Sequence, residues 1–283
     1  MARAGTARQV PRAREALLPS AAVAPGAYRT AGLSAWLVLP TYDEADTLEA
    51  VVRAAHGVLA PAAPEGFHIV VVDDASPDGT GAIADRLARE LAAVEVLHRP
   101  RRAGLGRAYL AGFARALEGG AGFVLAMDAD LSHDPADLAR LLAVARGGAL
   151  ALGSRYTSGG RIEGWGPVRR AVSRGGSRYA RTVLGMGVRD LTGGFKCFPR
   201  AILEAIDLPT VRSHGYAFQV ELTHRAACAG FPVVEVPIAF RERRAGQSKM
   251  TWRIALEAAW LVPALRLARP ALKSATGAPM RRT

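Results

Sequence analysis

Residues 122–130 read Gly-Phe-Val-Leu-Ala-Met-Asp-Ala-Asp, an apolar run that ends in two aspartates separated by one residue. The run lacks alternation of apolar and polar residues, which is typical of a strand buried on both faces of a sheet. Two carboxylates at the end of such a strand, where the chain turns, can point toward one hard cation. We therefore expect Asp128 and Asp130 to bind Mg²⁺ or Mn²⁺ together with phosphate oxygens and water. Taken alone, the triplet also fits a helix cap beside a solvated side chain, so the surrounding sequence has to decide.

Further apolar runs flank this one, and helical patterns separate them. The predicted strands are 35–39, 68–72, 94–98, 122–127 and 148–152, and the predicted helices are 46–58, 79–91, 106–117 and one that begins at Asp134-Pro135. Strands separated by helices predict an α/β fold with a mostly parallel sheet flanked by helices. The carboxyl ends of parallel strands share one edge, and such sheets bind ligands there.

Polar residues follow three of the predicted strands at this edge. They are Thr41-Tyr-Asp-Glu44, Asp73-Asp74 and Asp128-Ala-Asp130. Asp74 can accept hydrogen bonds from a ribose or a base edge, whereas Ser76-Pro-Asp-Gly79 is itself a turn signature. Three acidic strand ends in line favour a ligand site over three unrelated caps.

Arginines follow the fifth predicted strand. Arg169 and Ser173 share one face of a predicted helix because they are four residues apart, and Arg155 could complete a phosphate site with them. A stripe of arginines is more often a solvated face, and Arg170, Arg174 and Arg178 form such a stripe on the same helix.

Two later segments allow both a functional and a neutral interpretation. The basic segment from Arg241 to Lys249 is either a lid that closes over phosphates or a charged surface loop. Gln219 could read sugar hydroxyls, but it could equally be solvated.

The composition narrows the class of partner. The chain has 283 residues, a net charge of +12 and a pI near 10.7, which favours nucleic acid, an anionic membrane surface or phosphorylated ligands. A nucleic-acid-binding protein would interleave aromatic residues with its cations and would not need aspartates at strand ends; aromatics are only 6% here, so we expect no nucleic acid partner. Cys197 and Cys228 form no disulfide or zinc pattern, which indicates a cytoplasmic protein.

The chain is predicted to have three parts. Residues 1–33 form a flexible basic tail, 34–249 form one catalytic domain, and 250–283 form an amphipathic helical segment and tail. No stretch reaches the roughly 20 apolar residues that a membrane-spanning helix needs. The best candidate, near the C-terminus, is short and contains Pro263.

Together these motifs resemble the inverting nucleotide-sugar transferases of the GT-A (Rossmann-like) fold, and within them the polyprenyl-phosphate (dolichyl-phosphate) mannose synthases. The matching stretches are Leu39-Pro-Thr-Tyr-Asp-Glu44, Val71-Val-Asp-Asp-Ala-Ser-Pro-Asp-Gly-Thr80, Gly104-Leu-Gly106 with Ala108-Tyr109, Met127-Asp-Ala-Asp-Leu-Ser-His-Asp-Pro135, Gly153-Ser-Arg-Tyr156, Leu191-Thr-Gly-Gly-Phe-Lys196, Gly215-Tyr-Ala-Phe-Gln219 and Arg243 to Lys249.

The resemblance implies GDP-mannose as donor, a polyprenyl phosphate as acceptor and a divalent metal, Mg²⁺ or Mn²⁺. It implies nucleotide-sugar binding by Pro40, Tyr42, Glu44, Val72, Asp74, Asp128, Ala129, Gln219, Arg243 and Lys249; acceptor-phosphate binding by Arg155, Arg169 and Ser173; metal binding by Asp128 and Asp130; and catalysis by Asp130 and Arg155. The sequence departs from the pattern of this family at two positions. Asp43 replaces the usual Asn, and Ser132 replaces a glutamine that adds a metal ligand in some members.

This interpretation explains why the sequence offers no convincing general base. A phosphate monoester is already anionic at neutral pH and can attack an anomeric carbon without one. We also expect peripheral attachment to the cytoplasmic face of an anionic membrane through the arginine stripe and residues 252–267, which a separate membrane-anchoring protein could assist. The alternatives are the same fold acting with UDP-glucose or another nucleotide-sugar, and a catalytically inactive relative.

Overall fold

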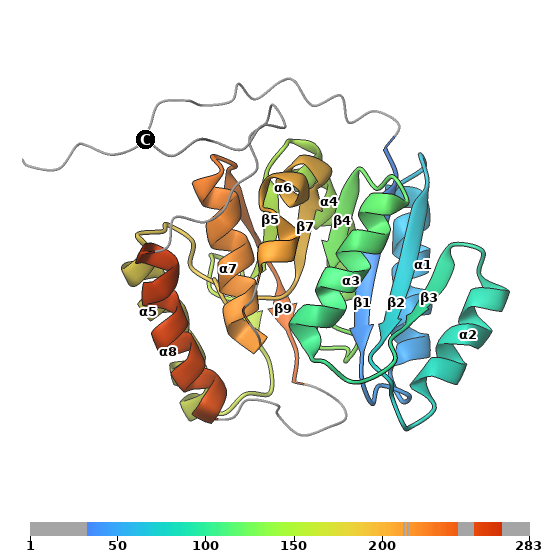
Figure 1. Ribbon diagram of the computed structural model, residues 1–283, viewed down its shortest axis with the longest axis horizontal. Coiled ribbons are helices and arrows are strands. Elements are labelled where there is room, and N and C mark those ends of the chain that lie inside the picture. Colours follow the sequence, from blue (N-terminus) through green and yellow to red (C-terminus); the bar gives the residue numbers. More distant parts are fainter. Residues whose placement is uncertain (1–32, 212, 214, 243–251, 268–283) are drawn as a thin grey trace, which may run out of the picture.

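The computed structural model describes residues 33–211, 213, 215–242 and 252–267 of the chain (Figure 1). Residues 1–32 of the predicted basic tail 1–33 and residues 243–249 of the predicted lid 241–249 lie outside the described residues. The strands are β1 (Ala35–Thr41), β2 (Phe67–Asp73), β3 (Val94–His98), β4 (Phe123–Ala126), β5 (Leu150–Ser154), β6 (Arg161–Ile162), β7 (Lys196–Pro199), β8 (Val233–Pro237) and β9 (Ala239–Phe240). The helices are α1 (Leu48–Ala62), α2 (Thr80–Glu90), α3 (Leu105–Glu118), α4 (Leu138–Arg146), α5 (Pro167–Leu184), α6 (Arg200–Ala205), α7 (Gly215–Cys228) and α8 (Trp252–Leu267), with short 3₁₀ turns at Pro135–Asp137 and Leu208–Thr210.

Seven strands form the central sheet in the order β3-β2-β1-β4-β7-β5-β8. All neighbouring pairs are parallel except those of β7, which runs antiparallel between β4 and β5. The α/β fold with a mostly parallel sheet is therefore confirmed, as are all five predicted strands. The antiparallel β7 was not predicted, because its four residues carry too short a pattern to be separated from the helix that follows.

Helices cover both faces of the sheet, as the unbroken apolar runs require. Leu37 and Leu39 of β1 pack with α1, α2 and α4 on one face, while Trp36 and Val38 pack with α3, α6 and α7 on the other. A third cluster joins α5, α7 and α8 beside β5, as Figure 1 shows at the left of the molecule.

The buried face of helix α5 is not the face that the sequence pattern predicts. The sequence pattern places Val172, Tyr179 and Val183 on the apolar stripe of this helix. Val172 and Tyr179 are exposed and Val183 is partly buried, whereas the buried side chains are Ser173, Ser177, Ala180 and Leu184. Small residues face the body of the protein because the helix packs closely against α8 and the loop before β7. In the part of the chain that the structure describes, no helix is long and apolar enough to cross a membrane.

Gly112 sets how closely α3 approaches the sheet. A Cβ at this position would lie 2.3 Å from Cγ1 of Val38 and 3.1 Å from Cγ2 of Val72. Gly112→Ala should therefore lower the free energy of unfolding by about 1–3 kcal/mol, the usual cost of overpacking a core. Urea unfolding measures the change. Gly57→Ala is the matched control, since a Cβ there meets nothing within 4 Å and should stabilise α1 by about 0.5–1 kcal/mol. Equal effects of the two substitutions would contradict the packing argument.

Candidate active site

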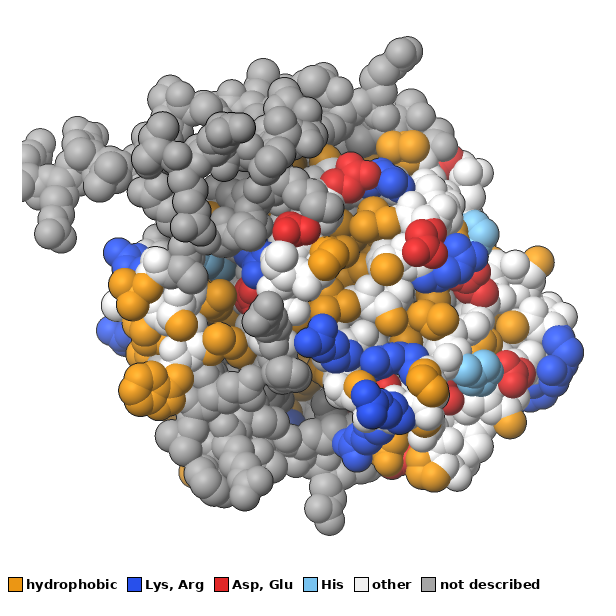
Figure 2. All heavy atoms as spheres, viewed as in Figure 1, with side chains coloured by type: hydrophobic (Ala, Val, Ile, Leu, Met, Phe, Trp, Pro, Cys, Tyr) orange, Lys and Arg blue, Asp and Glu red, His pale blue; other side chains and the backbone are white. Residues whose placement is uncertain are grey.

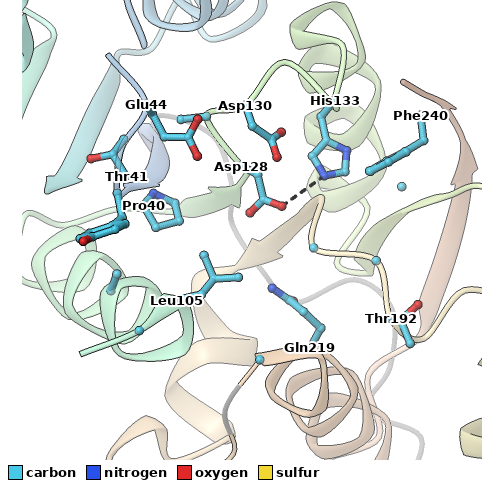
Figure 3. Close-up of a pocket in the computed structure, with 18 of the residues that line it drawn as sticks. Pro40, Thr41, Glu44, Leu105, Asp128, Asp130, His133, Thr192, Gln219 and Phe240 are labelled. Atoms are coloured by element: carbon cyan, nitrogen blue, oxygen red, sulfur yellow. Dashed lines mark ion pairs between the residues drawn. The ribbon is translucent and has the colours of Figure 1, made fainter. Parts of the chain in front are cut away.

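A cavity opens at the carboxyl ends of the parallel strands (Figure 3). Its walls come from the segments after β1, β2, β4 and β5, from the loop before β7, and from α3, α5, α7 and β9. Of the residues predicted for the site, the lining contains Pro40, Tyr42, Glu44, Asp74, Asp128, Ala129, Asp130, Arg155, Arg169 and Gln219. The predicted strand-end site is thus assembled in one place by the topology of the sheet.

Asp128 and Asp130 follow β4 and face the cavity. The Tyr109 hydroxyl donates to Oδ1 of Asp128 at 2.8 Å, and the Ser132 main-chain N–H donates to Oδ1 of Asp130 at 3.0 Å. Burial and the Asp128 charge raise the pKa of Tyr109 well above its usual value, so the phenol stays protonated and keeps donating. Ala129 between them is fixed by the Thr47 hydroxyl, which donates to its carbonyl oxygen at 2.7 Å.

The pair fits a divalent cation that shares its coordination with substrate. Both side chains offer hard carboxylate oxygens to the cavity, which suits Mg²⁺ or Mn²⁺. Among the described residues there is no group of three or more His, Cys, Asp or Glu side chains that could hold a metal without further ligands. The remaining positions would fall to oxygens of a bound diphosphate and to water.

His133 lies beside the carboxylates and was not singled out from the sequence. Its Nε2 is 3.8 Å from Oδ2 of Asp128, and its ring packs against Phe195 and Phe240. Burial lowers the pKa of His133, although Asp128 and Asp130 oppose this, and the imidazole is therefore neutral at pH 7.

Asp74 has a structural task in addition to its predicted contact with the nucleoside. Its Oδ1 accepts from Arg99 at 2.6 Å, and its Oδ2 accepts from the main-chain N–H groups of Ala103 and Gly104 at 2.9 and 2.8 Å. The carboxylate thereby fixes the loop that leads into α3 at the rim of the cavity.

Tyr42 and Val72, both predicted to bind the nucleoside, differ in their placement, because Tyr42 lines the cavity and Val72 does not. The Arg102 guanidinium stacks over the Tyr42 ring at 3.8 Å, which forms a flat cationic surface that the sequence did not indicate. Val72 is fully buried in the core and is not among the lining residues, so its side chain cannot contact a nucleotide directly. Figure 2 shows basic side chains gathered over the lower end of α3, near this rim.

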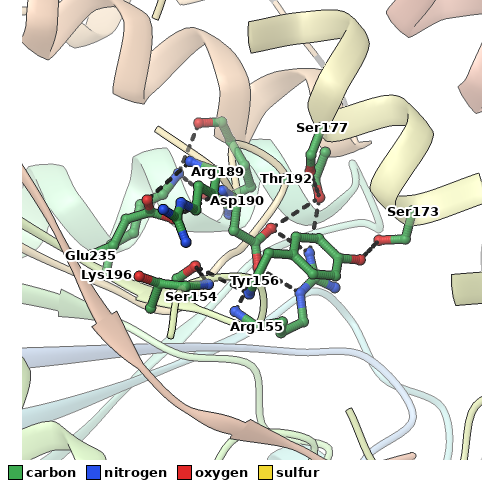
Figure 4. A network of polar contacts seen from close by, with 12 residues as sticks. Ser154, Arg155, Tyr156, Ser173, Ser177, Arg189, Asp190, Thr192, Lys196 and Glu235 are labelled. Carbon is green, nitrogen blue, oxygen red and sulfur yellow. Dashed lines mark hydrogen bonds and ion pairs between the residues drawn. The ribbon is translucent and has the colours of Figure 1, made fainter. Parts of the chain in front are cut away.

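Arg155 is held by a buried carboxylate that sequence reasoning missed (Figure 4). Asp190 accepts from the Arg155 main-chain N–H at 2.9 Å and from Nε and Nη2 at 2.7 Å each. Nη2 also donates to the Thr192 hydroxyl at 2.9 Å. The only signal for Asp190 was its place directly before the Leu191-Thr-Gly-Gly stretch. The ion pair fixes the guanidinium at the cavity wall.

The predicted pair of Arg169 and Ser173 is separated by the structure. Arg169 lines the cavity, where it stacks over Trp165 at 4.1 Å and donates to Glu242 at 2.9 Å. Ser173 is buried, accepts from the Tyr156 hydroxyl at 2.6 Å and does not line the cavity. Ser173 therefore holds Tyr156, whose ring lies 5.2 Å from the Arg155 guanidinium, a contact that the helical spacing could not reveal. Arg243 and Lys249 lie outside the described residues.

Gln219 is nearly buried on α7 and has a buried partner. Lys196 Nζ donates to the Gln219 carbonyl oxygen at 2.7 Å and to its Oε1 at 2.8 Å. Burial lowers the pKa of Lys196 to about 7, against the attraction of Asp190. The sequence pattern did not predict a role for Lys196, because a lysine at the start of a strand is expected to be exposed to solvent.

Comparison with known proteins identifies the protein family to which the chain belongs. Residues 36–207 match the family described as Glycosyl transferase family 2, and the chain belongs to that family. Two curated relatives are the polyprenol monophosphomannose synthase of Mycolicibacterium smegmatis, 49% identical over 76% of this chain and 80% of that protein, and the undecaprenyl-phosphate mannosyltransferase of Micrococcus luteus, 46% identical over 78% of this chain and 89% of that protein. The resemblance to polyprenyl-phosphate mannose synthases is thereby confirmed.

Solved structures share the fold at low sequence identity. Glucosyl-3-phosphoglycerate synthase from Mycobacterium tuberculosis, in complex with phosphoglyceric acid, aligns with a TM-score of 0.61 and 20% identity over 87% of this chain and 83% of that one. Mannosyl-3-phosphoglycerate synthase from Rubrobacter xylanophilus aligns with a TM-score of 0.59 and 21% identity over 83% and 74%. These likenesses confirm the GT-A fold.

The Arg155–Asp190 pair predicts a large stability effect. Asp190→Asn should lower the free energy of unfolding by about 3–5 kcal/mol, because it removes the buried negative charge that pairs with the Arg155 guanidinium. Urea unfolding measures the loss. Glu163→Gln, which breaks the exposed Arg161–Glu163 pair, is the control and should cost at most about 1 kcal/mol. A comparable cost for both would contradict the role of burial.

Lys196 predicts a dependence of stability on pH. Its pKa is about 7 in the folded protein and near 10.5 when exposed, so between these values the unfolded chain binds more protons. The free energy of unfolding of the wild type should therefore rise with pH, relative to Lys196→Met, between about pH 7 and pH 10. Urea unfolding of both proteins at several pH values tests this. Parallel pH profiles would show that the lysine titrates normally.

Proposed function

We propose that the protein transfers mannose from GDP-mannose to a polyprenyl monophosphate with inversion, forming polyprenyl-phosphate-mannose on the cytoplasmic face of a membrane. The observation that carries this proposal is that a pair of carboxylates and a pair of guanidinium groups line the same cavity. Asp128 and Asp130 lie on one wall, and Arg155 and Arg169 line the same cavity from the segment directly after β5 and from α5. The printed names of the two curated relatives support the choice of sugar and acceptor.

The carboxylates suit the leaving group of such a transfer. Asp128 and Asp130 would hold Mg²⁺ or Mn²⁺, which when bound neutralises the departing nucleoside diphosphate. Pro40, Tyr42 and Glu44 line the part of the cavity nearest β1, where the guanosine would bind. Tyr109 keeps Asp128 in place by its hydrogen bond, so the carboxylate does not have to reorganise when substrate binds.

The arginines suit the acceptor. Arg155 and Arg169 would orient the polyprenyl phosphate and offset its repulsion from the donor diphosphate. A phosphate oxygen then attacks the anomeric carbon as the bond to the nucleoside diphosphate breaks, which converts an α-linked donor into a β-linked product. The attacking oxygen is already anionic, so no side chain has to remove a proton from it.

Asp128→Ala should abolish transfer of labelled mannose from GDP-mannose to a short polyprenyl phosphate, and EDTA should do the same to the wild type. The reason is that both treatments remove the neutralisation of the leaving diphosphate. Asp85→Ala, which removes an exposed side chain of α2, is the control and should retain activity. Unchanged turnover of Asp128→Ala would overturn the metal assignment, and faster turnover of UDP-glucose than of GDP-mannose would favour the alternative donor.

We further propose that α5 and α8 contact an anionic membrane. Both helices expose apolar side chains, including Val168 and Val172 on α5 and Trp260 and Leu267 on α8, the last two at 82% and 85% of their surface. Arg170, Arg174 and Arg178 are exposed on α5 next to them. Apolar groups beside cations are the arrangement that anionic interfaces bind. A separate membrane-anchoring protein could assist.

Replacing Arg170, Arg174 and Arg178 with Gln should weaken binding to vesicles of anionic lipid by roughly 100-fold, since each basic residue near the surface contributes about 1 kcal/mol. Co-sedimentation measures the binding. Replacing Arg53, Arg86 and Arg89 with Gln changes the net charge equally on α1 and α2, at the other end of the molecule (Figure 1), and should have little effect. Equal losses would indicate that only net charge matters.

A further inference from the structure

Lys196 is a buried ionisable residue that the proposed mechanism does not use. It opens β7, between β4 and β5 in the middle of the sheet, and its side chain is fully buried. Burying an amine is costly unless its hydrogen bonds are satisfied. Here both known bonds go to one residue, to the carbonyl oxygen and the side-chain Oε1 of Gln219. The free-energy cost of burying this amine beside a residue of the cavity wall needs an explanation.

The contact fixes which way the Gln219 amide points. The oxygen end accepts from Lys196, so the NH₂ end must face the opposite side. A flipped amide would set its two N–H donors against the N–H donors of the lysine. When Lys196 is neutral, its two N–H groups still suffice for both contacts with Gln219, but its lone pair could then also accept from a flipped amide. The protonated form of Lys196, which has donors and no acceptor, therefore enforces the orientation of the amide.

The NH₂ end faces the part of the cavity next to the metal-binding carboxylates. In Figure 3 the nitrogen of Gln219 points toward Asp128 and the open space. A Cβ built on Gly194 would lie 3.3 Å from Nε2 of Gln219 and 3.8 Å from Oδ2 of Asp128. Gly194 therefore leaves space beside both groups, and a substrate atom there would meet an N–H donor on one side.

We propose that Lys196 is a positioning residue, which holds the Gln219 amide so that its NH₂ group donates a hydrogen bond to an oxygen of the sugar diphosphate of the donor. The identity of that donor rests on the proposed function, whereas the orientation of the amide does not. An oxygen of a hexose hydroxyl or of a phosphate suits the site because both accept from N–H. A carboxamide also adds no charge beside Asp128.

Support of the α7 backbone does not account for a lysine. The Thr223 hydroxyl already donates to the Gln219 carbonyl oxygen at 3.0 Å, in the same turn of the helix. What distinguishes Lys196 from Thr223 is the bond to Oε1. Two variants can therefore separate the side-chain effect from the backbone effect.

The dissociation constant of GDP-mannose, measured by calorimetry in the presence of Mg²⁺ or Mn²⁺, tests the proposal. Lys196→Met should weaken donor binding about tenfold, because the freed amide loses its fixed orientation, while the KM for polyprenyl phosphate stays unchanged. Gln219→Glu retains the acceptor for Lys196 but loses both N–H donors and adds a negative charge, so it should weaken donor binding at least as much without a lower thermal midpoint. Thr223→Val, the matched control, should bind the donor as the wild type does.

Wild-type affinity in Gln219→Glu, or equal weakening in Lys196→Met and Thr223→Val, would overturn the proposal. If Lys196→Met does not fold, the comparison of Gln219→Glu with Thr223→Val decides alone. Failure of the proposed function is seen separately, as a wild-type protein that transfers no mannose from GDP-mannose. The same comparison of dissociation constants with UDP-glucose then tests Lys196 independently of the sugar.

Discussion

The sheet is buried on both faces, and this constraint places every charged group of the site. Each residue of β1 from Ala35 to Thr41 is buried, with side chains packed alternately against the two helical layers. A charge inside such a strand would lie in a low-dielectric core without water, which costs several kcal/mol unless it is paired. Charges can therefore occur at the strand ends, where the helical layers part, and the cavity forms there.

Where charges do enter the interior, the structure gives each a fixed partner. Arg155 is held by three hydrogen bonds to Asp190, and Lys196 by two to Gln219. These contacts are not efficient sources of stability, because desolvation cancels much of the attraction. Their effect is geometric. They set a guanidinium and an amide at defined positions on the cavity wall before any ligand binds, which is how a site avoids reorganising during reaction.

The antiparallel strand β7 links these two contacts. It carries Lys196 at its first residue, and the loop before it supplies Asp190, Thr192 and Gly194. Because β7 lies between β4 and β5, this loop is brought between Asp128 and Arg155. A strand of only four residues thus connects the two walls of the cavity.

The sequence by itself determined the α/β fold, the five parallel strands and the residues at their ends, because unbroken apolar runs and the helices between them leave few other arrangements. It could therefore place Asp128, Asp130, Glu44 and Arg155 at one edge. It could not find Asp190, Lys196 or Arg102, nor separate Ser173 from Arg169, because these relations depend on contacts between segments far apart in the chain. Only the tertiary structure decided them, since the partner that a buried charge finds is fixed by how strands are ordered and not by the local pattern around it.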